Sequence, residues 1–320
     1  GRFVVMQLDP ADAAASLFVK QKPSQTQQAK MAAGGGPGKA GDVKESAPSL
    51  KQSAVPVRAG GQALVTQNTI NQVFDDFRQF EFADSQTGKT VRYNLFAPKN
   101  RQAGQRYPIV LFMHDAGVTG KNTQATLYQG NGAIAWATPE AQAENPCFVL
   151  APQFDEIIAD DDSQTSAYLD ATIHLIRALE QQYPIDPQRR YATGQSGGGM
   201  LSIAMNVKYP DFFAASYLVA CQWDAKVVAP MAKNKLWITV SEDDAKAYPG
   251  QQAIVKALAA HGAKTARAVW DAKWTPAQFQ TAFNAMDKQH ANVNFVAFAK
   301  GTVFAEGEST SGGSGHTNTW

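Results

Sequence analysis

From about residue 68 to its C-terminus, the chain alternates between short apolar segments and longer segments of helical periodicity. The apolar segments have the length of strands and are 77–84, 91–98, 107–115, 147–153, 189–195, 214–221, 235–242 and 293–299. The helical segments are 163–183, 198–210, 250–262 and 275–290. Strands that alternate with helices form a mostly parallel sheet with helices on both faces. We predict this α/β architecture for residues 68–320.

Residues 1–67 differ from the rest of the chain in composition. Between about residues 21 and 61, Gln, Lys, Ser, Ala and Gly dominate, which is typical of a linker or a long loop. Segments 2–8 and 62–67 have strand character, but a lone strand is not stable in water. We therefore expect residues 1–67 to form a small N-terminal β segment with a flexible linker, either part of a small β domain or strands added to the main sheet.

The charge balance limits the possible partners. Lys and Arg together number 29 against 28 Asp and Glu, a formal net charge of +1. Such a chain offers no broad basic field, so we expect neither nucleic acid nor an anionic membrane as a partner. The sequence also lacks a run of roughly 18 apolar residues, the length needed to cross a bilayer. A small or neutral substrate is the expected partner, and the oligomeric state is left open.

The N-terminus and the cysteines bear on location and cofactors. The chain begins at Gly1 inside an apolar run, from which we expect a processed N-terminus and a secreted or periplasmic protein. Cys147 and Cys221 are too few for a disulfide framework or a metal cluster, and we expect both to be unpaired core residues. We expect no metal and no organic cofactor.

The segment Gly194-Gln195-Ser196-Gly197-Gly198 joins a predicted strand to a predicted helix. Gly-x-Ser-x-Gly at such a junction is the nucleophile elbow of α/β-hydrolases, a sharp turn that lifts the serine hydroxyl above the sheet. Side chains at Gly194 and Gly198 would clash in so tight a turn. The alternative is a glycine-rich helix start without a catalytic role. The strand-turn-helix context favours Ser196 as a nucleophile.

The predicted strand 107–115 leads into the turn His114-Asp115-Ala116. In a fold with a nucleophile elbow, the loop after this strand and the residue after the serine each donate a backbone N–H to the oxyanion. These donors would be Ala116 and Gly197. His114 precedes the serine in the chain, and we expect it to brace the loop through its ring nitrogens instead of acting as the base.

Three acidic residues, Glu242, Asp243 and Asp244, follow the strand that ends near residue 241. A carboxylate placed after a strand on the C-terminal side of the serine can hold the imidazole tautomer and stabilise the imidazolium. We predict Asp244 for this role, with Asp243 as the second choice. A solvated acidic turn is the alternative.

Three histidines follow Asp244 in the sequence. His261 and His290 lie at the ends of predicted helices, where a histidine complements the helix dipole. His316 lies in a Gly- and Ser-rich loop after the last strand, where no packing or capping role is evident. It completes the order Ser, Asp, His that is usual in this fold. We therefore predict His316 as the base.

The chain from about residue 68 onward resembles esterases of the polyhydroxybutyrate-depolymerase and feruloyl-esterase-like branch of the α/β-hydrolases, many of them labelled predicted peptidases. The resemblance rests on segments 107–117, 136–154, 183–200, 211–222, 236–249 and 315–320. It implies an α/β-hydrolase fold and the triad Ser196, Asp244 and His316. It also implies that the N-terminal strands belong to an incomplete immunoglobulin-like β domain. The residues that it places near the substrate are Trp136, Gln153, Gln222 and Trp223.

The chain departs from the pattern of this branch at three places. Asp115 replaces the usual glycine after the histidine, and its carboxylate would disfavour anionic substrates or alter the angle of the oxyanion loop. Val240-Ser241 replaces His-Gly before the acid. The branch continues past the His-x-x-x-Trp segment into a final helix, whereas this chain stops at Trp320, so we expect either a removed helix or a less constrained tail around His316.

Together these features predict a serine carboxylic-ester hydrolase that acts through an acyl-enzyme on short-chain, aryl or polymeric esters. A serine peptidase of the same fold is one alternative, because the same histidine could protonate an amine leaving group. A non-catalytic binding module on a hydrolase scaffold is the other.

Overall fold

The computed structural model describes residues 38–44, 56–59, 62–65, 72–308, 310 and 313–320. Its centre is a nine-stranded sheet in the order β10-β11-β9-β8-β7-β5-β6-β4-β3. The strands are β3 (Arg78–Asp84), β4 (Lys89–Phe96), β5 (Tyr107–Met113), β6 (Phe148–Gln153), β7 (Ile185–Gln195), β8 (Ala215–Val219), β9 (Leu236–Ser241), β10 (Thr265–Trp270) and β11 (Val293–Phe298). Only β4 pairs antiparallel with its neighbours, β3 and β6, so the mostly parallel sheet predicted from the sequence is confirmed.

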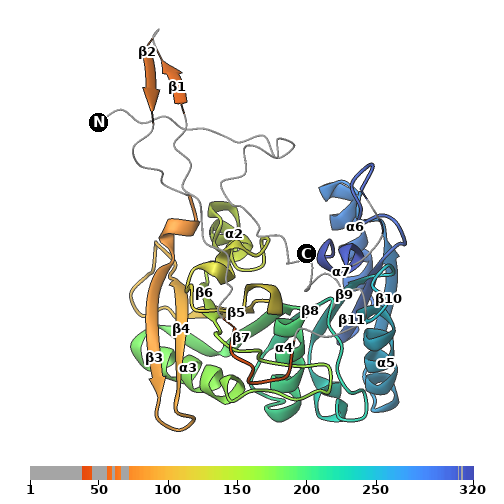
Figure 1. The fold of residues 1–320 in the computed structure, drawn as a ribbon. Coiled ribbons are helices and arrows are strands. Elements are labelled where there is room, and N and C mark those ends of the chain that lie inside the picture. The colour runs from red at the N-terminus through yellow and green to blue at the C-terminus, as the bar shows by residue number, and fades with distance from the viewer. Residues whose placement is uncertain (1–37, 45–55, 60–61, 66–71, 309, 311–312) are drawn as a thin grey trace.

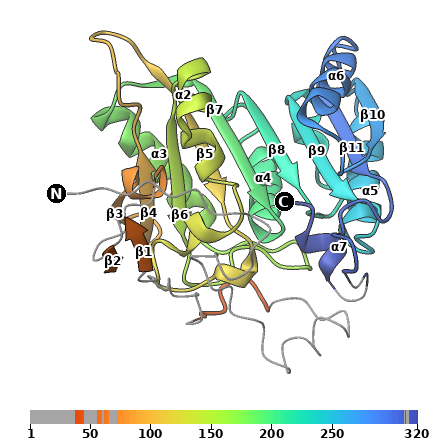
Figure 2. The same ribbon diagram turned by 90° about the horizontal axis from the view of Figure 1, so that it is seen from above.

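Helices cover both faces of this sheet, as predicted. The α-helices are α2 (Pro139–Glu144), α3 (Tyr168–Gln182), α4 (Gly197–Lys208), α5 (Ala247–Ala260), α6 (Pro276–Asp287) and α7 (Ser314–Thr317). Figure 1 shows α3, α4 and α5 on one face, with α2 and α6 on the other. The short helix α7 lies at the edge toward which the parallel strands point (Figure 2). That edge is where the loops after β5, β7, β8 and β9 gather.

Burial follows the strand pattern closely. In β5 and β6 nearly every side chain is buried, because both strands lie inside the sheet with helices on each side. The largest apolar cluster joins the inner strands to α3 and α4, and a second one lies beneath α5. The strand β10 was not predicted from the sequence. It is an edge strand with the burial pattern of a partly exposed segment, so its apolar signal is weak.

A partly buried hydrogen-bond cluster around Asp84 ties the hairpin of β3 and β4 to helix α3. His174 Nδ1 lies 2.9 Å from Asp84 Oδ2, and Thr87 donates to the same oxygen at 2.6 Å. Burial raises the pKa of the Asp84 carboxyl, but the hydrogen bonds from Thr87 and His174 outweigh it and hold that pKa below its ordinary value. The ionised carboxylate therefore helps to fasten this edge of the sheet.

The N-terminal part of the chain is described in three short pieces. Strands β1 (Pro56–Ala59) and β2 (Gln62–Val65) form an antiparallel pair separate from the main sheet. The predicted strand at 62–67 is thus confirmed as far as Val65, whereas the predicted strand at 2–8 lies outside the described residues. Residues 38–44 lie along the loop after β6, through hydrogen bonds such as Gly41 N–H to Ile157 O at 2.9 Å. The division at residue 67 stays a prediction.

Both cysteines are buried and free, as expected from the sequence. Burial raises the pKa of the Cys147 thiol to about 11 and that of the Cys221 thiol to about 12.

None of the described helices is long and apolar enough to pass through a bilayer.

Candidate active site

Ser196 occupies the tight turn between β7 and α4. Its backbone has φ 50° and ψ −119°, a conformation that non-glycine residues rarely adopt. A Cβ at Gly194 would lie 2.5 Å from the backbone carbon of Gly198, and a Cβ at Gly198 would lie 2.0 Å from Met113 O. The glycines on either side of Ser196 are therefore required by close backbone approach, as the sequence indicates.

The structure brings Ser196, His316 and Asp244 into one hydrogen-bonded chain. His316 Nε2 lies 2.9 Å from Ser196 Oγ, and His316 Nδ1 lies 2.5 Å from Asp244 Oδ2. The three side chains come from separate parts of the sequence, since 120 residues separate Ser196 from His316. Because Asp244 is acceptor-only when ionised, the ring proton lies on Nδ1 and the lone pair on Nε2 faces the serine.

Asp244 is only 4% exposed and is held by backbone donors as well as by the histidine. Its Oδ1 accepts hydrogen bonds from Ala247 N–H at 2.8 Å and Lys246 N–H at 3.1 Å. Burial raises the pKa of this carboxyl, but the bond to His316, its charge and the two backbone donors outweigh burial and keep that pKa below its ordinary value. Asp244 is thus an ionised, fixed partner for the imidazole.

The two neighbouring acidic residues hold the loop that follows β11. Glu242 Oε2 accepts from Lys300 N–H at 3.0 Å, and Asp243 Oδ2 accepts from Gly301 N–H at 2.6 Å. Each member of the acidic run therefore has a separate partner, and in the described part of the chain it is Asp244 that bonds the imidazole. The assignment of Asp244 as the acid stays a prediction.

His316 lies on helix α7, not on the open Gly- and Ser-rich loop expected from the sequence. Gly315 packs so closely against the acidic loop that a Cβ there would lie 2.7 Å from Asp243 Cβ. On the other side, the Trp320 ring meets the His316 ring edge-on at 5.0 Å between centroids. Asn318 donates to Glu308 at 2.9 Å, which ties α7 to the preceding loop. Tertiary contacts therefore order a segment whose composition favours disorder.

Ala116 and Gly197, the predicted oxyanion donors, lie side by side. A Cβ built on Gly197 would be 3.6 Å from Ala116 N. Among the residues that the structure describes, neither backbone N–H has a hydrogen-bond acceptor. Two free N–H groups next to the serine are what a developing oxyanion needs.

His114 braces the loop that carries Ala116, in agreement with the sequence-based expectation. It is fully buried, its Nδ1 donates to Asp115 O at 2.6 Å, and its Nε2 accepts from Phe154 N–H at 3.1 Å. Burial lowers the pKa of this imidazole, which keeps it neutral. Both ring nitrogens are used, so His114 is not available to Ser196.

Gln153 does not face the substrate side, in contrast to the expectation from the resemblance. It is 2% exposed, and its Oε1 accepts from Thr126 N–H at 2.8 Å. Its Nε2 donates to Val118 O at 2.8 Å and Gly120 O at 3.0 Å. The amide is therefore occupied in fastening the loop after β5, and this correction follows from its complete set of internal partners.

Gln222 and Trp223 line a cavity of roughly 320 Å³ that adjoins α4 at Met200 and that none of Ser196, Asp244 and His316 lines. Met200, whose backbone N–H donates to Ser196 O, forms part of the wall, together with Lys246 and Asp161. Gln222 Nε2 donates to Asp161 Oδ1 at 2.9 Å. Both residues are half-buried and near the nucleophile helix, a position compatible with contact to substrate.

Trp136 belongs to the 3-10 helix η5 (Ile134–Ala137) and is 37% exposed, with its ring N–H bonded to Gly132 O at 3.0 Å. It does not line the cavity beside Trp223.

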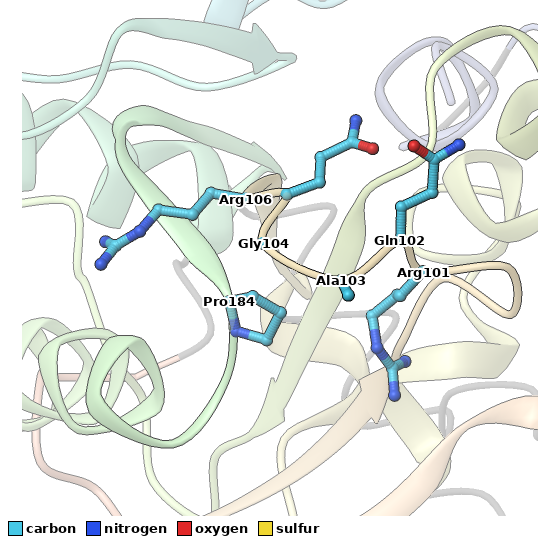
Figure 3. Close-up of a pocket in the computed structure, with 7 residues that line it drawn as sticks. Arg101, Gln102, Ala103, Gly104, Arg106 and Pro184 are labelled. Carbon is cyan, nitrogen blue, oxygen red and sulfur yellow. The ribbon is translucent and has the colours of Figure 1, made fainter.

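A larger cavity of roughly 510 Å³ lies at the opposite edge of the sheet, before the first residue of β5. Figure 3 shows that the side chains of Arg101 and Arg106 extend in different directions from its rim. Their guanidinium groups therefore do not converge on one anion. In the described part of the chain, no group of three or more His, Cys, Asp or Glu side chains is arranged to hold a metal ion.

Comparisons with known proteins add an independent line of information. Residues 85–294 match the family model described as "Putative esterase". The "Probable feruloyl esterase C" of Aspergillus terreus is 28% identical over 114 residues, 35% of this chain and 40% of that protein. The solved "Crystal Structure of a Thermostable Esterase" matches with a TM-score of 0.66 and 27% identity, covering 81% of this chain and 63% of that one. The chain thus spans less than two thirds of the length of either protein.

Proposed function

The chain belongs to the esterase family whose model it matches over residues 85–294, and from this we propose that it hydrolyses carboxylic esters with Ser196 as the nucleophile. Its fold is the α/β-hydrolase fold expected from the sequence. The observation that supports the proposal most directly is the contact of His316 Nε2 with Ser196 Oγ at 2.9 Å, with Asp244 bonded to the other ring nitrogen.

In the proposed acylation step, Ser196 Oγ attacks the ester carbonyl while His316 Nε2 takes the hydroxyl proton. The tetrahedral intermediate places a negative charge on the former carbonyl oxygen, which the N–H groups of Ala116 and Gly197 would stabilise. The imidazolium that forms lies against Asp244, whose ionised carboxylate favours that charge. His316 then gives the proton to the leaving alcohol, and the acyl group stays on Ser196.

Deacylation repeats these steps with water as the nucleophile. His316 accepts a proton from water, the hydroxide equivalent attacks the acyl-enzyme, and Ser196 leaves as the alcohol after it regains the proton from His316. Every proton in the cycle moves between Ser196, His316, water and the substrate. The scheme therefore invokes no cofactor.

We propose a small-molecule or polymeric ester as the substrate, with short-chain and aryl acyl groups as candidates. The cavity lined by Trp223 and Gln222 could take a group of the substrate next to the scissile bond, because an aromatic ring and an amide offer both an apolar surface and hydrogen bonds. Secretion or export to a periplasm, expected from the N-terminal sequence, stays a prediction.

Labelling with a fluorophosphonate probe tests the nucleophile directly. We expect one label per chain on Ser196 and none on the Ser196→Ala variant. An unlabelled, correctly folded parent would instead favour the non-catalytic binding module. Comparison of para-nitrophenyl butyrate with a peptide anilide then tests the leaving group, and faster turnover of the anilide would favour a peptidase.

A further inference from the structure

Asp115 makes hydrogen bonds through its backbone and side chain within the oxyanion loop. Its N–H donates to Gln129 Oε1 at 2.6 Å, and its carbonyl accepts from His114 Nδ1 at 2.6 Å. Its Oδ1 accepts from Gly117 N–H at 2.5 Å and so caps the 3-10 helix η3 (Ala116–Val118). The residue before the proposed oxyanion donor is therefore fixed at three points.

The cap also constrains the Ala116 N–H. Ala116 is the first residue of η3, between Asp115 and Gly117, so a bond that closes over it limits rotation of the Asp115–Ala116 peptide. Hydrogen-bond donors at an oxyanion are effective only when they are held in place before the reaction. A side-chain oxygen at the δ position of residue 115 makes this cap, and both Asp and Asn supply one as Oδ1.

The negative charge of the Asp115 carboxylate has an effect that is independent of the cap. In the described part of the chain, no lysine, arginine or histidine forms an ion pair with Asp115. Its carboxylate is half-buried, belongs to the residue before the proposed oxyanion donor Ala116, and contacts Gly117 on the other side of that donor. A like charge so close repels an anionic acyl group, and it does so more strongly at low ionic strength.

We propose that Asp115 is a positioning and specificity-determining residue of this site: its Oδ1 atom aims the Ala116 N–H, and its charge selects against esters whose acyl group is anionic. The inference rests on the proposed ester hydrolysis. A neutral residue such as Asn could make the cap alone, and selection against anionic acyl groups gives the carboxylate at this position a role of its own.

The two roles separate in a pair of variants. Asp115→Asn keeps the Oδ1 acceptor and removes the charge, whereas Asp115→Ala removes both. The substrates are para-nitrophenyl butyrate, which is neutral, and mono-para-nitrophenyl glutarate, whose acyl group carries a carboxylate. Asp211→Asn serves as a matched control, since Asp211 is exposed and lies before β8 at the opposite edge of the sheet.

For Asp115→Ala we expect kcat on the neutral ester to fall by about 10- to 100-fold with KM changed by less than about threefold, because a donor is misaligned and not removed. For Asp115→Asn we expect kcat on the neutral ester within about threefold of the parent. Its preference for the glutarate over the butyrate ester should rise by about tenfold at low salt and by much less in 1 M NaCl. Asp211→Asn should leave the preference unchanged.

Either of two results would overturn the inference. One is equal kcat for Asp115→Ala and Asp115→Asn on the neutral ester. The other is a salt-independent substrate preference that does not change in Asp115→Asn. Melting temperatures identify a variant that has merely unfolded, and the asparagine variant then still tests the charge. If the parent takes the fluorophosphonate label but no variant changes substrate preference, the inference fails while the proposed nucleophile stands.

Discussion

Gly315 is the residue whose replacement tests the proposed site most sharply. It precedes His316 on α7 and packs against the loop that carries the acid. A Cβ at this position would lie 2.7 Å from Asp243 Cβ and 2.9 Å from the Asp243 backbone carbon and oxygen. Carbon atoms in contact prefer a separation of about 3.5–4.0 Å. Because the opposing atoms are mostly backbone, Gly315→Ala should push α7 away by about 1 Å.

A shift of that size acts on both hydrogen bonds of His316. They are 2.5 Å to Asp244 and 2.9 Å to Ser196, so a displacement of about 1 Å would take one or both beyond bonding distance. Misplacement of a reacting group by 1 Å costs about 100-fold in rate, equivalent to about 2.7 kcal/mol of activation free energy. We therefore expect kcat/KM of Gly315→Ala to fall by about 100-fold, with KM little changed.

The assay is the steady-state hydrolysis of para-nitrophenyl butyrate, with the fluorophosphonate labelling rate as a second readout. Ser314→Ala is the matched control, because it changes a half-buried neighbour on the same short helix without adding an atom beside Asp243. Activity of Gly315→Ala within about twofold of the parent would refute the reasoning. Equal losses in Gly315→Ala and Ser314→Ala would assign the effect to α7 stability instead.

Three further predictions concern the site and the fold. Ser196→Ala and His316→Ala should each abolish measurable ester hydrolysis with the melting temperature retained. His290 is exposed beyond α6, and His290→Ala should keep full activity. Loss of activity in His290→Ala with an active His316→Ala would exclude the proposed base. Gln153→Leu should lower the free energy of unfolding by about 1–3 kcal/mol in urea titrations, because buried groups lose their partners, with little change in substrate preference. Asp84→Asn should lower the free energy of unfolding at pH 7. Because folding lowers the pKa of Asp84, the difference in unfolding free energy from the parent should shrink as pH falls below about 4. Urea titrations between pH 7 and pH 3 would detect this change.

Much of the sheet could be predicted from the sequence because its inner strands are apolar on both sides. The strands β5 and β6 are buried along almost their whole length, so their apolar runs are unambiguous. The first four residues of β7, by contrast, are Ile-Asp-Pro-Gln, of which only Ile185 is buried, and the strand was predicted only from residue 189 onward. Partly exposed positions weaken the periodic signal.

Helix α7 shows the limit of local sequence patterns at the site. Gly and Ser have poor helix propensity, so the sequence around His316 favours an open loop. The helix forms because Gly315 can approach Asp243 and because Trp320 packs on His316, contacts that only the folded chain supplies. The chemical type and chain order of the proposed triad could nevertheless be predicted, since they depend on residue identity and on position after a strand.

The residues near the substrate were the least predictable part. A family resemblance can place Gln153 near the site, yet it does not indicate which way the amide points. In the folded chain that amide is turned inward and fully bonded. Orientation of a polar side chain depends on which backbone groups around it lack partners, and these are set by loops distant in sequence.

The acidic run at 242–244 fixes the positions of both His316 and Asp244 through its contacts. Glu242 and Asp243 hold the chain that leads from β11 toward α7, and Asp244 holds the imidazole itself. If His316 is the base, the imidazole that takes the Ser196 proton and the carboxylate that stabilises the imidazolium are assembled together when the chain folds. The reorganisation needed to align them is then completed before any substrate arrives, and turnover does not have to repeat it.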